Sequence, residues 1–144
     1  MPYEKITPEI IEKLKAVVGP KNVVTDADAM QPYSHDEVTD PAYHRMPEAV
    51  VFAETAEEVS AVLKLANDFH FPVVPRGAGT GLACGAVPEY GGIVLSLEKM
   101  NKILEINTEG LYAVVEPASA RRTSRMRPNS RTSFMPAIPA AATR

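Results

Sequence analysis

Apolar residues recur at helical spacing in two segments of the chain. The first segment opens at Thr7, a residue type favoured at helix N-caps, with Pro8 and Glu9 in the first turn, and it stops at Gly19-Pro20. Its apolar face is formed by Ile10, Ile11, Leu14, Val17 and Val18. This spacing predicts a helix over residues 8–18.

The second helical segment begins with a stronger signal. Thr55-Ala56-Glu57-Glu58 is a capping box, in which the threonine and the glutamate three residues later satisfy free N–H groups of the first turn. The apolar stripe that follows is Val59, Val62, Leu63, Ala66 and Phe69. The pattern predicts a helix that packs one stripe on a sheet. His70 comes next, and we expect it to help end the helix because cations are favoured at helix C-termini.

Short apolar runs between and after these helices predict strands. They lie at residues 49–52, 73–74, 93–96, 102–107 and 111–116. The order of elements predicts an α+β fold in which short helices pack on a small mixed sheet. A glycine-rich segment would then follow the carboxyl end of the strand at 73–74.

That segment holds three glycines at alternate positions, Gly77, Gly79 and Gly81. Glycine lets a ligand approach the main chain closely, so such a run can turn several N–H groups toward one anion, and Arg76 adds a cation beside them. The spacing differs from a dinucleotide-binding fingerprint, because Leu82 stands where the third glycine would be, and no P-loop lysine follows. The segment is interpreted as a phosphate loop, with an ordinary glycine-rich turn as the alternative.

Composition limits the class of protein. A chain of 144 residues with 45% hydrophobic and 23% charged residues suits one modest soluble domain. A single cysteine, Cys84, excludes an internal disulfide and a thiolate zinc site and is typical of a reducing compartment. The sequence shows neither a signal peptide nor an apolar run of about 18 residues, so we expect no transmembrane segment.

Several sets of residues combine to give a resemblance to a known family. They are residues 47–51, 55–59, 73–82, 84–86, 92–96 and 101–107. Together they resemble the vanillyl-alcohol-oxidase-type (PCMH-type) FAD-binding superfamily, and within it the branch of the glycolate oxidase FAD subunit and D-lactate dehydrogenase. The likeness runs from about residue 33 to residue 117.

The resemblance implies a cofactor and its contacts. FAD would be held by Pro75, Arg76, Gly77, Ala78, Gly79, Thr80, Gly81, Leu82, Gly85 and Ala86, chiefly through main-chain N–H groups. Relatives that bind flavin covalently at this loop have a histidine where Thr80 stands, so the resemblance implies non-covalent FAD.

The resemblance also implies a function for the longer protein. Residues 1–117 would be the N-terminal portion of the FAD-binding domain of a 2-hydroxy-acid oxidoreductase, which transfers hydride from glycolate or D-lactate to FAD. Family members are several times longer, and their catalytic residues lie in the portion that this chain lacks, so no catalytic residue is assigned here. An iron-sulfur electron-transfer subunit is an implied partner. The implied location is the cytoplasm, including the inner face of the membrane.

Charge marks a boundary near Ala118. Residues 1–117 contain 18 acidic and nine basic residues, whereas residues 118–144 contain six arginines and no acid. The tail fits translation in a shifted frame: YAGDPCSGD, a segment typical of relatives, spells Met135 to Thr143 when GC-rich codons are read one base later. We therefore expect residues 118–144 to be a non-native, disordered tail. A basic arm for nucleic acid or membrane is a weaker alternative.

Other candidates for chemistry are weak. His35, Asp36, Glu37 and Asp40 have the side chains of metal ligands, but this polar segment lies between prolines and is interpreted as a solvated loop. No metal site and no nucleic-acid partner are therefore expected. Two alternatives to the flavoenzyme interpretation remain: an inactive truncated product, and a small interaction module with a basic tail.

Overall fold

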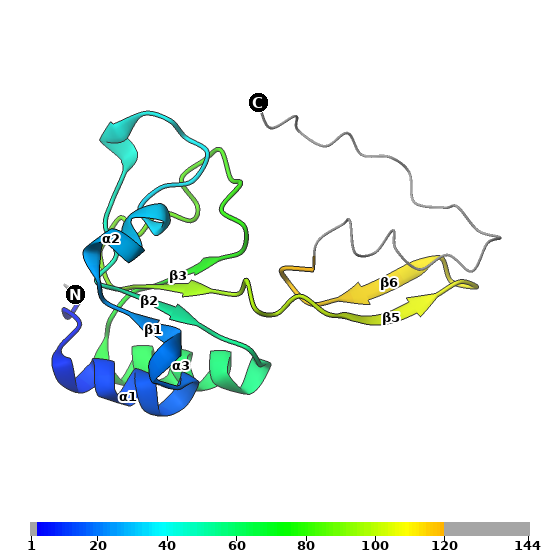
Figure 1. Ribbon diagram of the computed structural model, residues 1–144, viewed down its shortest axis with the longest axis horizontal. Coiled ribbons are helices and arrows are strands. Elements are labelled where there is room, and N and C mark those ends of the chain that lie inside the picture. The colour runs from blue at the N-terminus through cyan, green and yellow to red at the C-terminus, as the bar shows by residue number, and fades with distance from the viewer. Residues whose placement is uncertain (1–2, 120–144) are drawn as a thin grey trace.

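The computed structural model describes residues 3–119 and has three layers (Figure 1). Helices α1 and α3 cover one face of a four-stranded sheet, and the short helix α2 with the loops near it covers the other face. The helices are α1 (Pro8–Val18), α2 (Ala27–Met30) and α3 (Ala56–Phe69), with 3₁₀ turns at Pro20–Asn22, Gln31–Tyr33 and Pro41–Tyr43. The strands of this sheet are β1 (Val23–Val24), β2 (Ala49–Phe52), β3 (Val73–Arg76) and β4 (Ile93–Ser96).

The sheet is mixed and has the order β1-β2-β4-β3. Strands β2, β4 and β3 run parallel, and β1 pairs antiparallel with β2. The carboxyl ends of the three parallel strands therefore meet at one edge of the sheet. Ligands of open parallel sheets bind outside that edge, and the glycine loop leaves β3 there.

The core lies on both faces of the two central strands. Toward α1 and α3, Val51 and Leu95 pack against Leu14 and Val62 in the larger cluster. Toward α2, Val50 and Val94 pack with Met30. Every residue of β4 is buried, as expected for a central parallel strand that is covered on both faces.

Both predicted helices are confirmed, with their caps. The Thr7 hydroxyl accepts a hydrogen bond from the Ile10 N–H at 3.3 Å, and the Thr55 hydroxyl accepts one from the Glu58 N–H at 3.2 Å. The Glu58 carboxylate reaches back one residue further than in a standard capping box and accepts from the Glu54 N–H at 2.7 Å.

The end of α3 has a backbone geometry that the sequence did not predict. His70 adopts the left-handed conformation, with φ 57° and ψ 38°, and its N–H donates to the carbonyl of Ala66. The Phe71 N–H donates to the same carbonyl at 3.2 Å, and the Phe71 side chain is buried. These are features of a Schellman-type helix end, in which backbone geometry rather than side-chain charge stops the helix.

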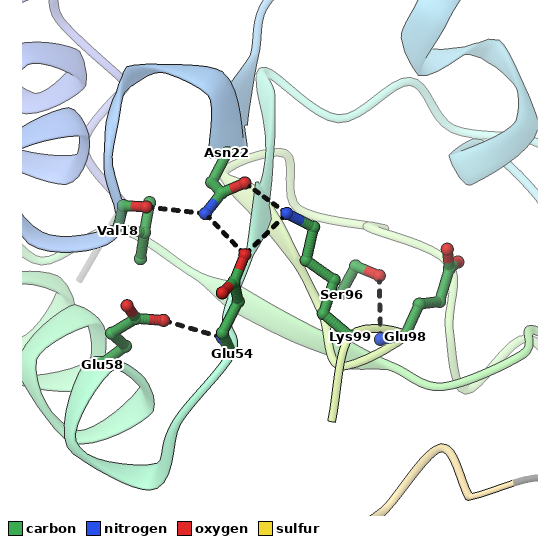
Figure 2. Close-up of polar contacts among 7 residues, drawn as sticks. All are labelled: Val18, Asn22, Glu54, Glu58, Ser96, Glu98 and Lys99. Atoms are coloured by element: carbon green, nitrogen blue, oxygen red, sulfur yellow. Dashed lines mark hydrogen bonds and ion pairs between the residues drawn. The ribbon is translucent and has the colours of Figure 1, made fainter. Parts of the chain in front are cut away.

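A polar network joins three chain segments at the carboxyl edge of the sheet (Figure 2). Lys99 Nζ donates to Glu54 Oε1 at 2.7 Å and to Asn22 Oδ1 at 2.6 Å, and Asn22 Nδ2 donates to the Val18 carbonyl at 2.7 Å. The hydrogen bond from Lys99, followed by that from Asn22, lowers the pKa of Glu54. The network ties the segments after β2 and β4 to the segment before β1.

The last two strands form a separate hairpin, β5 (Ile103–Asn107) and β6 (Tyr112–Val115), which projects away from the main sheet (Figure 1). All five predicted strands are confirmed to within two residues, while β1 and α2 were not predicted. In the described part of the chain, no helix is long and apolar enough to cross a membrane. Of the predicted tail, residues 118–144, the structure describes only Ala118 and Ser119, and the rest lies outside the described residues.

Candidate functional site

The glycine loop leaves β3 at Arg76 and continues to Ala86 without regular secondary structure. Main-chain hydrogen bonds fix the loop at its start and near its middle. The Arg76 carbonyl accepts from the Leu97 N–H at 2.9 Å, and the Gly81 carbonyl accepts from the Glu37 N–H at 3.0 Å. The loop is therefore tied both to the segment after β4 and to the segment after α2.

The backbone N–H groups of residues 77–86 form the most distinctive feature of this loop. Not one of these ten groups donates to an acceptor among the residues that the structure describes, although the carbonyls of Gly81 and Cys84 do accept. Most of these residues are exposed or half-buried, so water can reach the free donors. A run of free N–H groups at the carboxyl edge of a parallel sheet is suited to bind an anion such as a phosphate.

Glycine is present at different positions of the loop for different structural reasons. A Cβ added to Gly77 or to Gly85 would meet no atom within 4 Å, and neither residue has a positive φ. Gly79 has φ +71°, and a Cβ there would overlap the guanidinium of Arg76. The fold itself therefore requires glycine at position 79, whereas at 77 and 85 the absence of a side chain only keeps the surface of the loop open.

The Arg76 side chain lies beneath the loop and already has partners. It is 9% exposed, and its Nη1 and Nη2 atoms donate to the carbonyls of His35 at 2.7 Å and Pro32 at 3.1 Å. The guanidinium also lies over the ring of Tyr33, 5.4 Å from its centroid. No sequence pattern indicated that this cation would bind carbonyls rather than point toward a ligand.

The remaining predicted site residues lie along the same continuous stretch. Pro75, on β3, is exposed, and so are Ala78, Thr80 and Leu82, the last at 78%. Ala86 is half-buried next to Val87, whose N–H donates to the Cys84 carbonyl at 3.1 Å. The predicted residues thus share one loop, and whether they contact a cofactor stays a prediction.

The segment after α2 is part of this site, and interpreting it as a solvated loop was wrong for Asp36. That side chain is 6% exposed; its Oδ1 accepts from the Val38 N–H at 3.0 Å, and its buried Oδ2 has no partner among the described residues. The same Oδ2 would lie 3.3 Å from a Cβ at Gly81. His35 stacks on His44 with ring centroids 4.6 Å apart. No group of three potential metal ligands occurs among the described residues.

Tyr33 joins this segment to the sheet. Its ring meets Phe52 edge-on at 5.7 Å and lies beneath the Arg76 guanidinium. Burial, and then the negative charge of Glu98, raise the pKa of the Tyr33 phenol, while Arg76 acts in the opposite direction. Residues 32–38 thus support the glycine loop from below, a role for which the sequence carried no recognisable motif.

Comparison with known proteins identifies the family. Residues 47–121 match the FAD binding domain family. The chain is 44% identical over 114 residues to a D-lactate dehydrogenase of Anaerostipes hadrus, covering 79% of this chain and 24% of that protein. It is 40% identical over 112 residues to glycolate oxidase subunit GlcD of Bacillus subtilis, covering 78% of this chain and 23% of that protein.

A solved structure gives the same result. The crystal structure of p-cresol methylhydroxylase with substrate bound superposes with a TM-score of 0.66 at 34% identity, over 75% of this chain and 21% of that one. The chain therefore spans about a quarter of the length of the relatives it matches. The predicted α+β fold and the predicted cofactor, FAD, are confirmed. On this evidence the chain belongs to the FAD binding domain family, among flavoproteins of the vanillyl-alcohol-oxidase type.

Proposed function

We propose that the glycine loop binds the diphosphate of FAD through its main-chain N–H groups, within the FAD-binding portion of a 2-hydroxy-acid oxidoreductase. The observation that carries this proposal is the run of ten N–H groups without a protein acceptor among the described residues. The open surface at Gly77 and Gly85 is the second support, because a phosphate must approach the main chain closely to accept several of these hydrogen bonds.

The contribution of this chain to the reaction is to hold and orient the cofactor. When bound, FAD supplies the chemistry by accepting a hydride from the carbon that bears the substrate hydroxyl. The loop supplies fixed N–H dipoles, and Thr80 offers a hydroxyl that forms no covalent link to flavin, so FAD is held non-covalently in this proposal. No residue of the chain is assigned to proton transfer.

The substrate and partners of the longer protein are proposed from its relatives. Two of them are named as a D-lactate dehydrogenase and as a subunit of glycolate oxidase. We therefore propose a small 2-hydroxy acid as substrate and an electron-accepting partner subunit, with an iron-sulfur protein as the expected type. The single cysteine, Cys84, supports a reducing, cytoplasmic location.

Residues 1–117 alone should bind FAD weakly. Each hydrogen bond to a charged phosphate contributes about 1.5–3 kcal/mol, and association must offset about 4–15 kcal/mol of lost freedom. Among the described residues, the loop offers donors for the diphosphate, while the flavin ring of the longer protein would also contact residues beyond this chain. We expect dissociation constants above the micromolar range.

Nuclear magnetic resonance of the ¹⁵N-labelled chain tests this proposal, because it detects millimolar affinities residue by residue. Titration with ADP, which carries the diphosphate of FAD, should shift the amide signals of residues 77–86. Gly77→Val should abolish those shifts without lowering the melting temperature, since its side chain projects into open space. Thr80→Val is the matched control: it keeps the side-chain volume and should bind ADP within about threefold of wild type, because the main chain makes the contacts.

Two results would contradict the proposal. One is the absence of any amide shift in the loop at saturating ADP. The other is equal ADP binding by wild type and Gly77→Val. Either would favour an inactive product or an interaction module over a flavin-binding unit.

A further inference from the structure

Arg76 carries a buried charge that forms no ion pair among the described residues. Its guanidinium donates to the carbonyls of Pro32 and His35 and lies against the Tyr33 ring. None of the ion pairs in the described part of the chain includes it. A buried cation held by carbonyl dipoles and a π face acts over a longer range than an exposed one, because little water screens it, and the buried carboxylate of Asp36 beside Gly81 opposes part of its field.

Gly79 lies directly against this cation. A Cβ at position 79 would overlap Arg76 Nη2 and Cζ, and two hydrogen bonds at 2.7 and 3.1 Å keep the guanidinium from moving away. A Cβ added to Gly77, two residues earlier in the same loop, would meet no atom within 4 Å. The loop thus packs directly on Arg76 at residue 79, and we call this contact the seating of the loop. The Glu37 N–H fixes the loop a second time, by donating to the Gly81 carbonyl.

We propose that Arg76 is a positioning residue that holds the glycine loop from beneath and places a positive charge under its free N–H groups without contacting the phosphate. This inference rests on the proposed function for the identity of the bound anion. Fixing the loop at residue 79 holds the neighbouring free N–H groups in one arrangement, and the buried charge favours an anion bound by them.

A double-mutant cycle tests the seating of the loop without any ligand. Gly79→Ala in the wild-type background should lower the melting temperature by about 10 °C, since it combines a left-handed alanine with an overlap in a packed site. In an Arg76→Met background, the additional loss from Gly79→Ala should be less than about half of that, because methionine can move aside. Gly77→Ala is the matched control and should change the melting temperature by less than about 2 °C in both backgrounds.

If Gly79→Ala lowers the melting temperature equally in both backgrounds, the proposed seating is wrong. Should Arg76→Met not fold, Arg76→Lys replaces it in the cycle. Lysine can reach one carbonyl but not both, so the loss caused by Gly79→Ala should again be smaller than in wild type.

The role toward an anion is tested by titrating inorganic pyrophosphate against the loop amide signals at a temperature where each variant is folded. We expect affinity about tenfold lower for Arg76→Met and within about threefold of wild type for Arg76→Lys, which keeps the charge. A folded Arg76→Met that binds pyrophosphate as tightly as wild type would overturn the positioning role. If even wild type shows no binding, the proposed function fails, whereas the thermal cycle still decides whether Arg76 seats the loop.

Discussion

Two physical explanations are possible for the way His70 ends helix α3, and one set of substitutions can separate them. His70 is the last residue before the chain turns back, and it has φ 57° and ψ 38°. If its role is electrostatic, any neutral replacement should be equally unfavourable. If its role is to adopt the left-handed conformation, glycine and alanine should differ, because only glycine reaches that conformation without a steric penalty.

The expected magnitude follows from the backbone. A left-handed conformation costs about 1–2 kcal/mol for a residue with a Cβ, and glycine avoids this cost. Glycine loses about 0.4–1 kcal/mol relative to alanine because the unfolded chain is more flexible. His70→Gly should therefore be more stable than His70→Ala by up to about 1.5 kcal/mol, with a central value of about 1 kcal/mol. For a domain of this size that difference corresponds to about 3–5 °C in melting temperature.

Thermal unfolding followed by circular dichroism at pH 5 and pH 8 measures this difference. The gap between the glycine and alanine variants should be the same at both pH values, since neither side chain titrates. His70→Asn should lie near His70→Gly, because asparagine also tolerates the left-handed region. Equal melting temperatures for His70→Gly and His70→Ala, both below wild type only at pH 5, would refute the geometric explanation and restore the electrostatic one.

Three further predictions concern residues outside the glycine loop. Gly92→Ala should lose more than about 3 kcal/mol and precipitate on expression, because its Cβ would overlap the Pro72 carbonyl at φ +72°. Leu111→Gly should raise the melting temperature by about 2–6 °C, because it removes an exposed left-handed leucine from the β5–β6 turn. Since the pKa of Glu54 is lowered, its ion pair with Lys99 stabilises the fold above the ordinary glutamate pKa and ceases to do so as the pH falls through the lowered value. Urea unfolding between about pH 3 and pH 7 should show a smaller acid-induced loss in Glu54→Gln than in wild type, and parallel profiles would contradict this assignment.

The elements could be predicted from the sequence where local chemistry determines them. Thr7 and Thr55 are N-caps, and each apolar stripe has the period of the helix it forms. The buried strands β2 and β4 are continuous apolar runs with the bounds that the pattern gave. Strand β1 has only two residues, Val23 and Val24, so it carries no period, and it exists because it pairs with β2.

The support beneath the loop could not be predicted, because it depends on contacts between residues far apart in the sequence. Asp36 and Gly81 are brought together only when the segment after α2 packs beside the loop that follows β3. A polar, proline-flanked segment has the composition of a solvated loop, yet here it buries a carboxylate and accepts two hydrogen bonds from Arg76. The composition of a segment shows that it can remain in contact with water, but only its packing against the rest of the chain determines which of its polar groups become buried.

The two glycines at 77 and 79 look alike in the sequence and differ in the structure. Glycine at 79 is required by Arg76 beneath it, so a substitution there damages the protein whether or not a ligand binds. Glycine at 77 has no such requirement, since its Cβ would meet nothing within 4 Å. A bulky residue at 79 is therefore a poor probe of phosphate binding, because lost binding would follow from a displaced loop. Gly77 separates the two causes, because a side chain at that position can interfere only with whatever approaches the loop from outside.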